Sequence, residues 1–204
     1  MTILNAEQFW SFSIKVYEPL ATTFLCLQNQ LELDVNLLLL CCWLGGKRRI
    51  LTDNEFLVLI EKIAPFRNQL IKPLREARRF AKKIEAIANS QDLKNKILVV
   101  ELEAERLEQM ILLETLRGFD LLYALHDYSE AESTMLNFQS YLTALNVQTT
   151  EGANAALKKP SRICLGSRIN LEIRLGSRHI IVVGWGHTRF SRTRHSHHTV
   201  DGHN

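Results

Sequence analysis

A cluster of basic side chains near the middle of the chain is the clearest candidate for binding chemistry. Arg75, Arg78, Arg79 and Lys82 recur within one short segment, and Lys83 follows them. Helical spacing places these side chains along one broad face, and guanidinium groups match the oxygens of phosphate. The cluster is therefore a candidate site for an anion or a partner. A solvated face that pairs with nearby glutamates is the structural alternative.

No arrangement of residues predicts catalysis. His126 and Asp127 are sequence neighbours, which do not face each other on a helix, and no nucleophile accompanies them at a recognisable spacing. Glu101 and Glu105 share a helix face, as in di-metal carboxylate bundles, but such sites also need Glu-x-x-His pairs, and residues 1–147 contain one histidine. We expect no catalytic residue, no cofactor and no metal site, and whether the protein is an enzyme stays open.

The element that should organise the fold is a short helix that follows Asp34. Asp34 is suited to cap its start, and Gly45 and Gly46 are expected to end it in left-handed geometry. The run between them has no polar stripe, so other helices should surround it, and it is too short to cross a bilayer. Asn36 interrupts this run, and a buried amide without partners would cost about 1–3 kcal/mol. Asp34 and Asn36 are therefore expected to form a structural polar core.

Apolar residues at helical spacing predict further helices around this element. The first should end near Glu18, because Pro19 disfavours helical geometry in the residue before it and suits a new first turn. Thr52 or Asp53 should cap a later helix that stops before Pro65. The buried stripe of that helix is expected at Phe56, Leu57, Ile60 and Ile63. Ser129 or Ser133 should cap the last helix.

The basic segment is expected to form an antiparallel hairpin with the longest helix, through residues 89–91. Apolar residues in that helix recur in steps of four and three, which is typical of a packing seam. They are Leu93, Ile97, Val100, Ala104, Leu107 and Ile111. Its glutamates, Glu108 among them, should lie on the surface, where ion pairs with the basic helix would contribute about 0–1 kcal/mol each.

The chain changes character after about residue 147. The stretch from Lys158 to the end carries nine Lys and Arg residues against two acidic ones, although the whole chain has a net charge of only +3. Alternating apolar residues at 169–173 and a β-branched run at 180–183 are compatible with a two-stranded hairpin, and most of the tail is expected to be disordered. Its histidines lack cysteine partners at zinc-finger spacing, so a flexible tract is expected. They include His195, His197, His198 and His203.

These patterns predict an all-α protein with a compact bundle of about six helices around a short buried central helix. We expect a helical domain over residues 1–147, then a linker and a basic, mostly disordered tail over residues 148–204. The N-terminus shows no basic region followed by an apolar run and a cleavage site, so a cytoplasmic location is expected.

Several motifs resemble a family of small proteobacterial proteins, the domain of unknown function of the DUF2390 type. They are Phe9-Trp10-x-Phe12-Ser13, Tyr17, Cys26-Leu27, Asp34-Val35-Asn36-Leu37-Leu38-Leu39 with Trp43, and the segments around Arg75 and Glu101. The resemblance covers roughly residues 5–145. It implies an all-helical domain and supplies no activity, cofactor or catalytic residue.

Three functions follow as hypotheses. The first is a non-enzymatic adaptor or regulatory protein that binds another protein through the basic helix and through exposed parts of Phe9, Trp10 and Phe12. The alternative is a carrier or enzyme that holds a phosphorylated or anionic small molecule with Arg75, Arg78, Arg79 and Lys82. The third is nucleic-acid binding through the basic tail. No membrane partner is expected.

Overall fold

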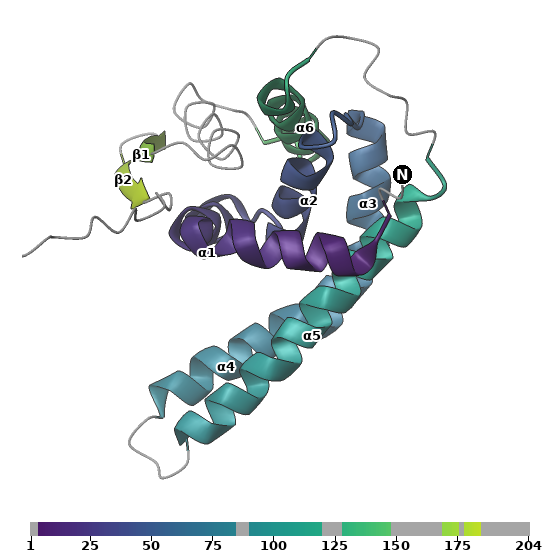
Figure 1. Ribbon diagram of the computed structural model, residues 1–204. Coiled ribbons are helices and arrows are strands. Elements are labelled where there is room, and N and C mark those ends of the chain that lie inside the picture. Colours follow the sequence, from purple (N-terminus) through teal and green to yellow (C-terminus); the bar gives the residue numbers. More distant parts are fainter. Residues whose placement is uncertain (1–3, 85–89, 120–127, 148–168, 176–177, 185–204) are drawn as a thin grey trace, which may run out of the picture.

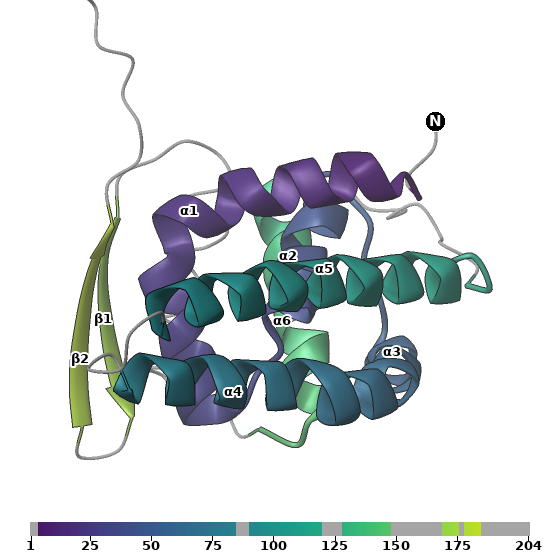
Figure 2. The same cartoon turned by 90° about the horizontal axis from the view of Figure 1, so that it is seen from below.

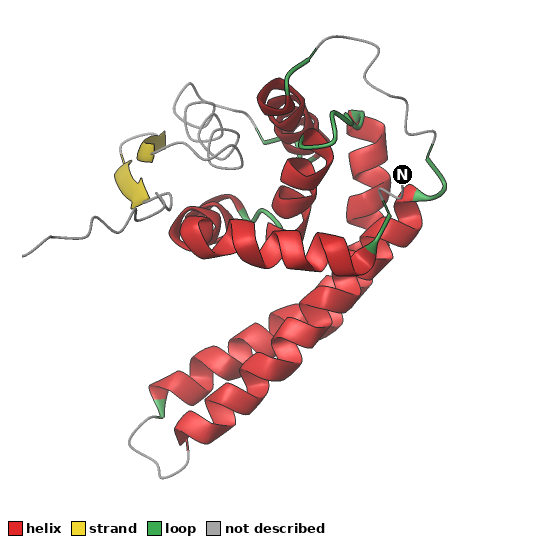
Figure 3. Ribbon diagram, in the orientation of Figure 1, coloured by secondary structure: helices red, strands yellow, loops and turns green. Residues whose placement is uncertain are grey.

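The computed structural model describes residues 4–84, 90–119 and 128–147, together with the backbone of residues 169–175 and 178–184 (Figure 1). Its helices are α1 Ala6–Leu31, α2 Val35–Gly45, α3 Asp53–Phe66, the π-helical turn η1 Arg67–Ile71, α4 Lys72–Lys83, α5 Ser90–Leu116 and α6 Glu130–Ala144. Figure 3 shows that residues 4–84, 90–119 and 128–147 are helical apart from short connections. The predicted all-α bundle is confirmed.

The centre of the fold is α2, as the sequence predicts. Every residue of α2 is buried, and α1, α5 and α6 contact it (Figure 1). Removing each leucine side chain from water contributes about 1.5–3 kcal/mol, so this run of four leucines explains why the other helices gather here. Their core side chains include Phe9, Phe24, Phe56, Phe138 and Tyr141.

Two predicted helix boundaries are wrong. α1 continues through Pro19 to Leu31, where Glu32 takes left-handed geometry at φ 54°. α3 continues through Pro65 and passes through η1 into α4, with Pro73 in its first turn. Proline costs a helix about 3 kcal/mol, but the α1 residues that follow Pro19 bury side chains against the core. Figure 2 shows that α1 bends along its length, which fits the internal proline.

The glycines at the end of α2 do not provide left-handed geometry. Gly46 is right-handed, at φ −62° and ψ −11°, and the left-handed residue of this turn is Arg48, at φ 53°. Gly45 is needed for close packing instead, since a Cβ there would lie 2.0 Å from Thr134 Oγ1 and 2.6 Å from Thr134 Cα. The absence of a side chain at Gly45 therefore lets α6 approach α2.

The side of α5 that faces α4 also differs from the prediction. The two helices pack side by side as the expected hairpin (Figures 1 and 2). However, Leu93, Val100 and Leu107 of the predicted seam are about half exposed, while Glu101 and Glu108 are buried. Arginines on α4 pair with carboxylates of α5, so half of the predicted seam is left on the outside. The other half is inside or partly buried, with Ala104 buried.

Side chains cap the starts of α3 and α6 as expected. Thr52 and Glu55 form a reciprocal capping box at α3, and Ser129 and Glu132 form another at α6. The predicted stripe of α3 needs one correction, because Leu59 is buried where Leu57 had been expected.

Beyond the helices, β1 Ile169–Leu175 and β2 Arg178–Gly184 pair as an antiparallel hairpin. Ile169 lies opposite Gly184 and Leu175 opposite Arg178, so the hairpin inferred from the sequence is confirmed. The disorder expected of the tail concerns residues outside the described ones, and the domain boundary near residue 147 stays a prediction. No helix in the described part of the chain has the length and apolar character needed to span a membrane.

Candidate functional site

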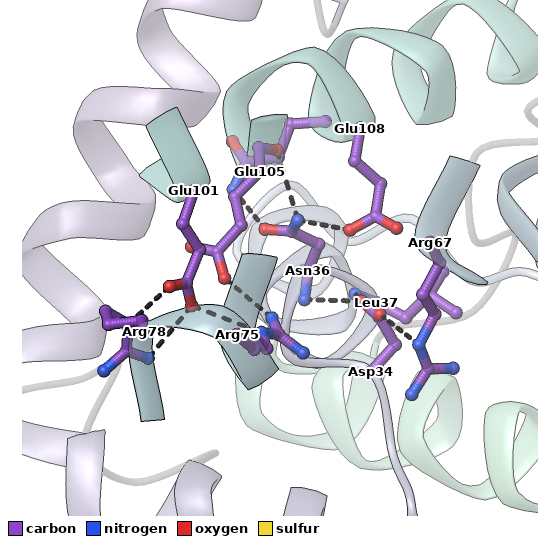
Figure 4. A network of polar contacts seen from close by, with 10 residues as sticks. Asp34, Asn36, Leu37, Arg67, Arg75, Arg78, Glu101, Glu105 and Glu108 are labelled. Carbon is purple, nitrogen blue, oxygen red and sulfur yellow. Dashed lines mark hydrogen bonds and ion pairs between the residues drawn. The ribbon is translucent and has the colours of Figure 1, made fainter. Parts of the chain in front are cut away.

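Asp34 joins three elements at the start of α2. Its Oδ1 accepts the backbone N–H groups of Asn36 at 2.8 Å and Leu37 at 3.2 Å, which caps the helix. Its Oδ2 lies 3.1 Å from Arg67 Nε (Figure 4). Its own N–H donates to Tyr141 Oη at 2.8 Å. Burial, and then the Asp34 charge, raise the pKa of Tyr141, so this hydroxyl stays protonated.

The Asn36 side chain joins α2 to α5 and, through a glutamine, to α1. Its Nδ2 donates to Glu108 Oε2 at 2.6 Å and to the Glu105 carbonyl oxygen at 3.2 Å. Its Oδ1 accepts from Gln109 Nε2 at 2.9 Å, and that nitrogen also lies 3.0 Å from Ser13 Oγ. These partners satisfy the amide that the apolar helix buries, which avoids the cost of an unpaired polar group.

Glu108 is a titratable group in the middle of this network. Its side chain is fully buried, and Asn36 is its hydrogen-bond partner. Burial, and then the nearby Asp34 carboxylate, raise the pKa of Glu108 to about 8. The carboxyl group is therefore mainly neutral at pH 7 and becomes charged slightly above it.

Two of the candidate arginines point between α4 and α5. Arg75 NH2 lies 2.6 Å from Glu105 Oε1, and its Nε lies 3.5 Å from Glu101 Oε1. Arg78 donates to both oxygens of Glu101 through Nε and NH2 (Figure 4). Burial raises the pKa of Glu105 even though Arg75 opposes the shift. Both arginines therefore have internal carboxylate partners.

Comparison with protein families places this network in a known group. The model described as "Protein of unknown function (DUF2390)" matches residues 8–112. The chain belongs to this family. The match spans α1 to most of α5, a shorter stretch than the resemblance suggested, and it contains Asp34, Asn36, Arg75 and Glu108. Searches of curated proteins and of solved structures found no match.

The other two candidate cations of this DUF2390 chain follow Arg75 and Arg78 by four residues each, so they lie one helical turn further along α4. Arg79 and Lys82 are exposed, and so are Lys72 and Lys83. We call these four residues the basic face of α4. Glu76 is exposed among them, so the face carries four positive charges and one negative charge. The sequence cluster is thus divided between internal ion pairs and this surface.

The aromatic residues near the N-terminus are largely part of the core. Phe9 is buried, and its ring centroid lies 5.6 Å from that of Trp43. Phe12 lies 5.2 Å from the same ring, and Lys47 Nζ lies 4.0 Å above it. Phe9 therefore cannot belong to the expected contact surface, and Trp10 and Phe12 are only half exposed.

Sequence reasoning missed several members of the network. Arg67 lies in η1, and no pattern indicated that a π-helical turn would aim it at Asp34. No sequence pattern indicates that Tyr141 Oη accepts the Asp34 N–H. The sequence predicts Glu108 on the surface and gives no role to Gln109. A second missed group surrounds Asn137, whose Oδ1 accepts the Leu51 N–H at 2.8 Å and whose Nδ2 donates to the Arg49 carbonyl at 2.7 Å.

The other predicted site residues give little further chemistry. Within the described residues, no group of three or more His, Cys, Asp or Glu side chains is arranged to hold a metal ion. Glu101 and Glu105 contact arginines instead. Residues outside the described part of the chain include His126, Asp127, His195, His197, His198 and His203.

Proposed function

We propose that this DUF2390 chain is a non-enzymatic adaptor or regulatory protein that binds an acidic protein surface through the basic face of α4. The observation that carries the proposal is the division of the arginine cluster. Arg75 and Arg78 have internal glutamate partners, whereas Lys72, Arg79, Lys82 and Lys83 are exposed. The positive charge available to a partner therefore lies on the surface of one helix.

The same division argues against the alternative, a carrier or enzyme that holds an anion with Arg75, Arg78, Arg79 and Lys82. The Arg75 side chain is only 11% exposed, and its carboxylate partners lie on α5. An incoming phosphate would have to displace Glu101 or Glu105 and leave a buried carboxylate without its counter-ion, which is costly.

The extent of the basic face favours a protein partner over a small anion. Lys72 and Lys83 mark the two ends of α4, and a helix of this length spans about 16 Å. Charges spread over that distance can contact several carboxylates of a protein surface at once, whereas one phosphate group contacts cations within hydrogen-bond distance. Rim charges of this kind chiefly accelerate association and select partners.

We further propose a cytoplasmic location for the adaptor. Cys41 is a free, buried thiol, and free thiols persist in reducing compartments.

The experiment compares two double charge reversals. Arg79→Glu with Lys82→Glu changes the basic face, and Lys15→Glu with Lys62→Glu changes exposed cations of α1 and α3 by the same total charge. Each tagged protein, with its fold checked by circular dichroism, is used to capture proteins from lysate of the source cells. Captured proteins are quantified by mass spectrometry at low and high salt after nuclease treatment.

We expect an acidic protein whose capture falls at least tenfold in the basic-face variant, stays within twofold in the control variant, and weakens as salt rises. Equal capture by both variants would contradict the proposal. A thermal-shift screen with phosphorylated metabolites provides the opposing test. Stabilisation that depends on Arg79 and Lys82, without a captured protein, would support the carrier instead.

A further inference from the structure

A second surface of the hairpin is apolar and exposed. Leu93, Val100 and Leu107 are spaced seven residues apart on α5 and are 48%, 51% and 48% exposed. Seven residues are close to two helical turns, so the three side chains form a line along one side of α5. On α4, Phe80 is 64% exposed. Exposed side chains of this size are individually common, but a line of them at heptad spacing marks a surface for another helix.

The apolar residues of α4 and α5 lie on the same side of the hairpin. Arg78 and Glu101 contact each other and mark the sides on which the helices meet. Val100 directly precedes Glu101, so it lies about 100° around α5 from the side that meets α4. Ala77 directly precedes Arg78, so it lies about 100° around α4 from the side that meets α5, in the same sense when each helix is viewed along its own chain direction. In antiparallel helices that rotation leads to the same side. Ala77 is also exposed, and we call Ala77, Phe80, Leu93, Val100 and Leu107 the apolar face of the hairpin.

The basic face lies on the other side of α4 from this apolar face. Arg79 directly follows Arg78, so it is rotated about 100° in the opposite sense from Ala77. Figure 2 shows α4 and α5 in front of the other helices, with no described helix crossing over them. A partner can therefore reach the apolar face while the basic face remains accessible.

Charges beside the apolar face indicate what covers it. Lys96 and Glu103 are exposed, have opposite signs, and lie four residues before and three residues after Val100. If two α5 helices pair antiparallel about Val100, Lys96 of each copy meets Glu103 of the other. Lys96 is now paired with Asp92 at 2.8 Å, but both side chains are mostly exposed, and such a pair contributes little.

We propose that two copies of this chain associate through the apolar face, with their α5 helices antiparallel, to form a four-helix bundle from two hairpins. The surface is self-complementary, as a two-fold interface requires. Apolar side chains meet along its centre, and the two Lys96–Glu103 contacts set the direction of pairing. This association goes beyond the proposed adaptor function, since it uses the side of the hairpin away from the basic face.

The test measures molar mass against concentration by light scattering and sedimentation equilibrium, with the full chain. We expect a monomer–dimer equilibrium for the unchanged protein. Val100→Glu with Leu107→Glu should raise the dimer dissociation constant by on the order of a hundredfold, because it places like charges in the centre of the interface. The matched control is Leu98→Glu with Leu102→Glu, which alters exposed residues on the other side of α5, two positions before and after Val100. It should leave that constant within threefold.

A charge exchange tests the orientation. Lys96→Glu alone should weaken the dimer about tenfold, and adding Glu103→Lys should restore it. Circular dichroism checks that each variant keeps its helical content. A monomer at several hundred micromolar would overturn the proposal. So would a dimer that survives Val100→Glu with Leu107→Glu, or one that the control weakens equally. Failure of the charge exchange to restore association would overturn the antiparallel pairing.

Discussion

The body around α2 and the α4–α5 hairpin bury opposite kinds of side chain. In the body, leucines and aromatic rings fill the interior, and the buried side chains of Asp34 and Asn36 have hydrogen-bond partners. In the hairpin, Arg75, Arg78 and Glu101 lie between the helices, while Leu93 and Val100 lie outside. The hairpin therefore buries charged pairs beside small residues such as Ala81 and Ala104 and leaves larger apolar side chains exposed.

This difference shows what a periodic pattern can establish. An apolar repeat indicates that a helix has a face suited to packing, but it does not name the partner. In α2 every side is apolar, so the pattern alone predicts that the whole helix is buried. In α5 both an apolar face and a carboxylate face are available, and the arginines of α4 select the carboxylates.

The largest effect is expected at the closest contact of the body. Gly45→Ala places a methyl group 2.6 Å from Thr134 Cα, so α2 and α6 must separate. We expect a loss of at least about 3 kcal/mol in the free energy of unfolding, measured by guanidinium chloride denaturation. Gly46→Ala is the control, since its Cβ would lie 3.5 Å from the Cys42 carbonyl oxygen. A similar loss in both variants would show that helix ending, rather than close packing, requires these glycines.

The next effect concerns the carboxyl group that lies between body and hairpin. The folded pKa of Glu108, about 8, lies above the ordinary value of about 4.3. Its contribution to stability is therefore complete below pH 4 and is lost as pH rises toward 8. We expect the free energy of unfolding to fall by up to about 4 kcal/mol between pH 5 and pH 8.5. Glu108→Gln should remove most of this slope.

The control for this titration is Glu103→Gln, at an exposed position of α5. It should keep the slope of the unchanged protein in the same denaturation series. An equally steep slope in Glu108→Gln would mean that Glu108 is already ionised at pH 5, and the network would then hold a charged carboxylate.

A smaller effect compares a buried helix cap with an exposed one. Asp34→Ala removes the cap of α2 and leaves Arg67 without its ion pair, so we expect a loss of about 2 kcal/mol. Thr52→Ala removes the exposed cap of α3 and should cost about 1 kcal/mol. Thermal unfolding followed by circular dichroism measures both. Equal losses would indicate that Asp34 acts through its cap alone.

Much of the fold follows from local features of the sequence. The burial of α2 was predictable because the run after Asp34 lacks a polar side, and the capping boxes at Thr52 and Ser129 depend on residues three positions apart. Local rules failed at Pro19 and Pro65, where packing of the following residues outweighs the missing hydrogen bond.

The candidate site was less predictable because its partners are distant in the sequence. Asn36 meets Glu108 across 72 residues, and Arg67 reaches Asp34 from a π-helical turn. The burial of a polar core at Asp34 and Asn36 could be anticipated from the surrounding leucines. Which side chains satisfy it depends on the crossing of α2 and α5, which no short motif specifies.

The central claim is that the α4–α5 hairpin buries charged side chains between its helices. The most direct test compares two adjacent residues, Val100 and Glu101, which are 51% and 3% exposed. Guanidinium chloride unfolding of Val100→Gln and Glu101→Ala at low micromolar concentration, where the chain is monomeric, measures each side of α5. With the carboxylate inside, Val100→Gln should change stability by less than about 0.5 kcal/mol. Glu101→Ala should cost about 2 kcal/mol, because Arg78 loses its carboxylate partner and Arg75 keeps only Glu105. A large loss at Val100 with none at Glu101 would contradict this arrangement and restore the apolar seam between α4 and α5.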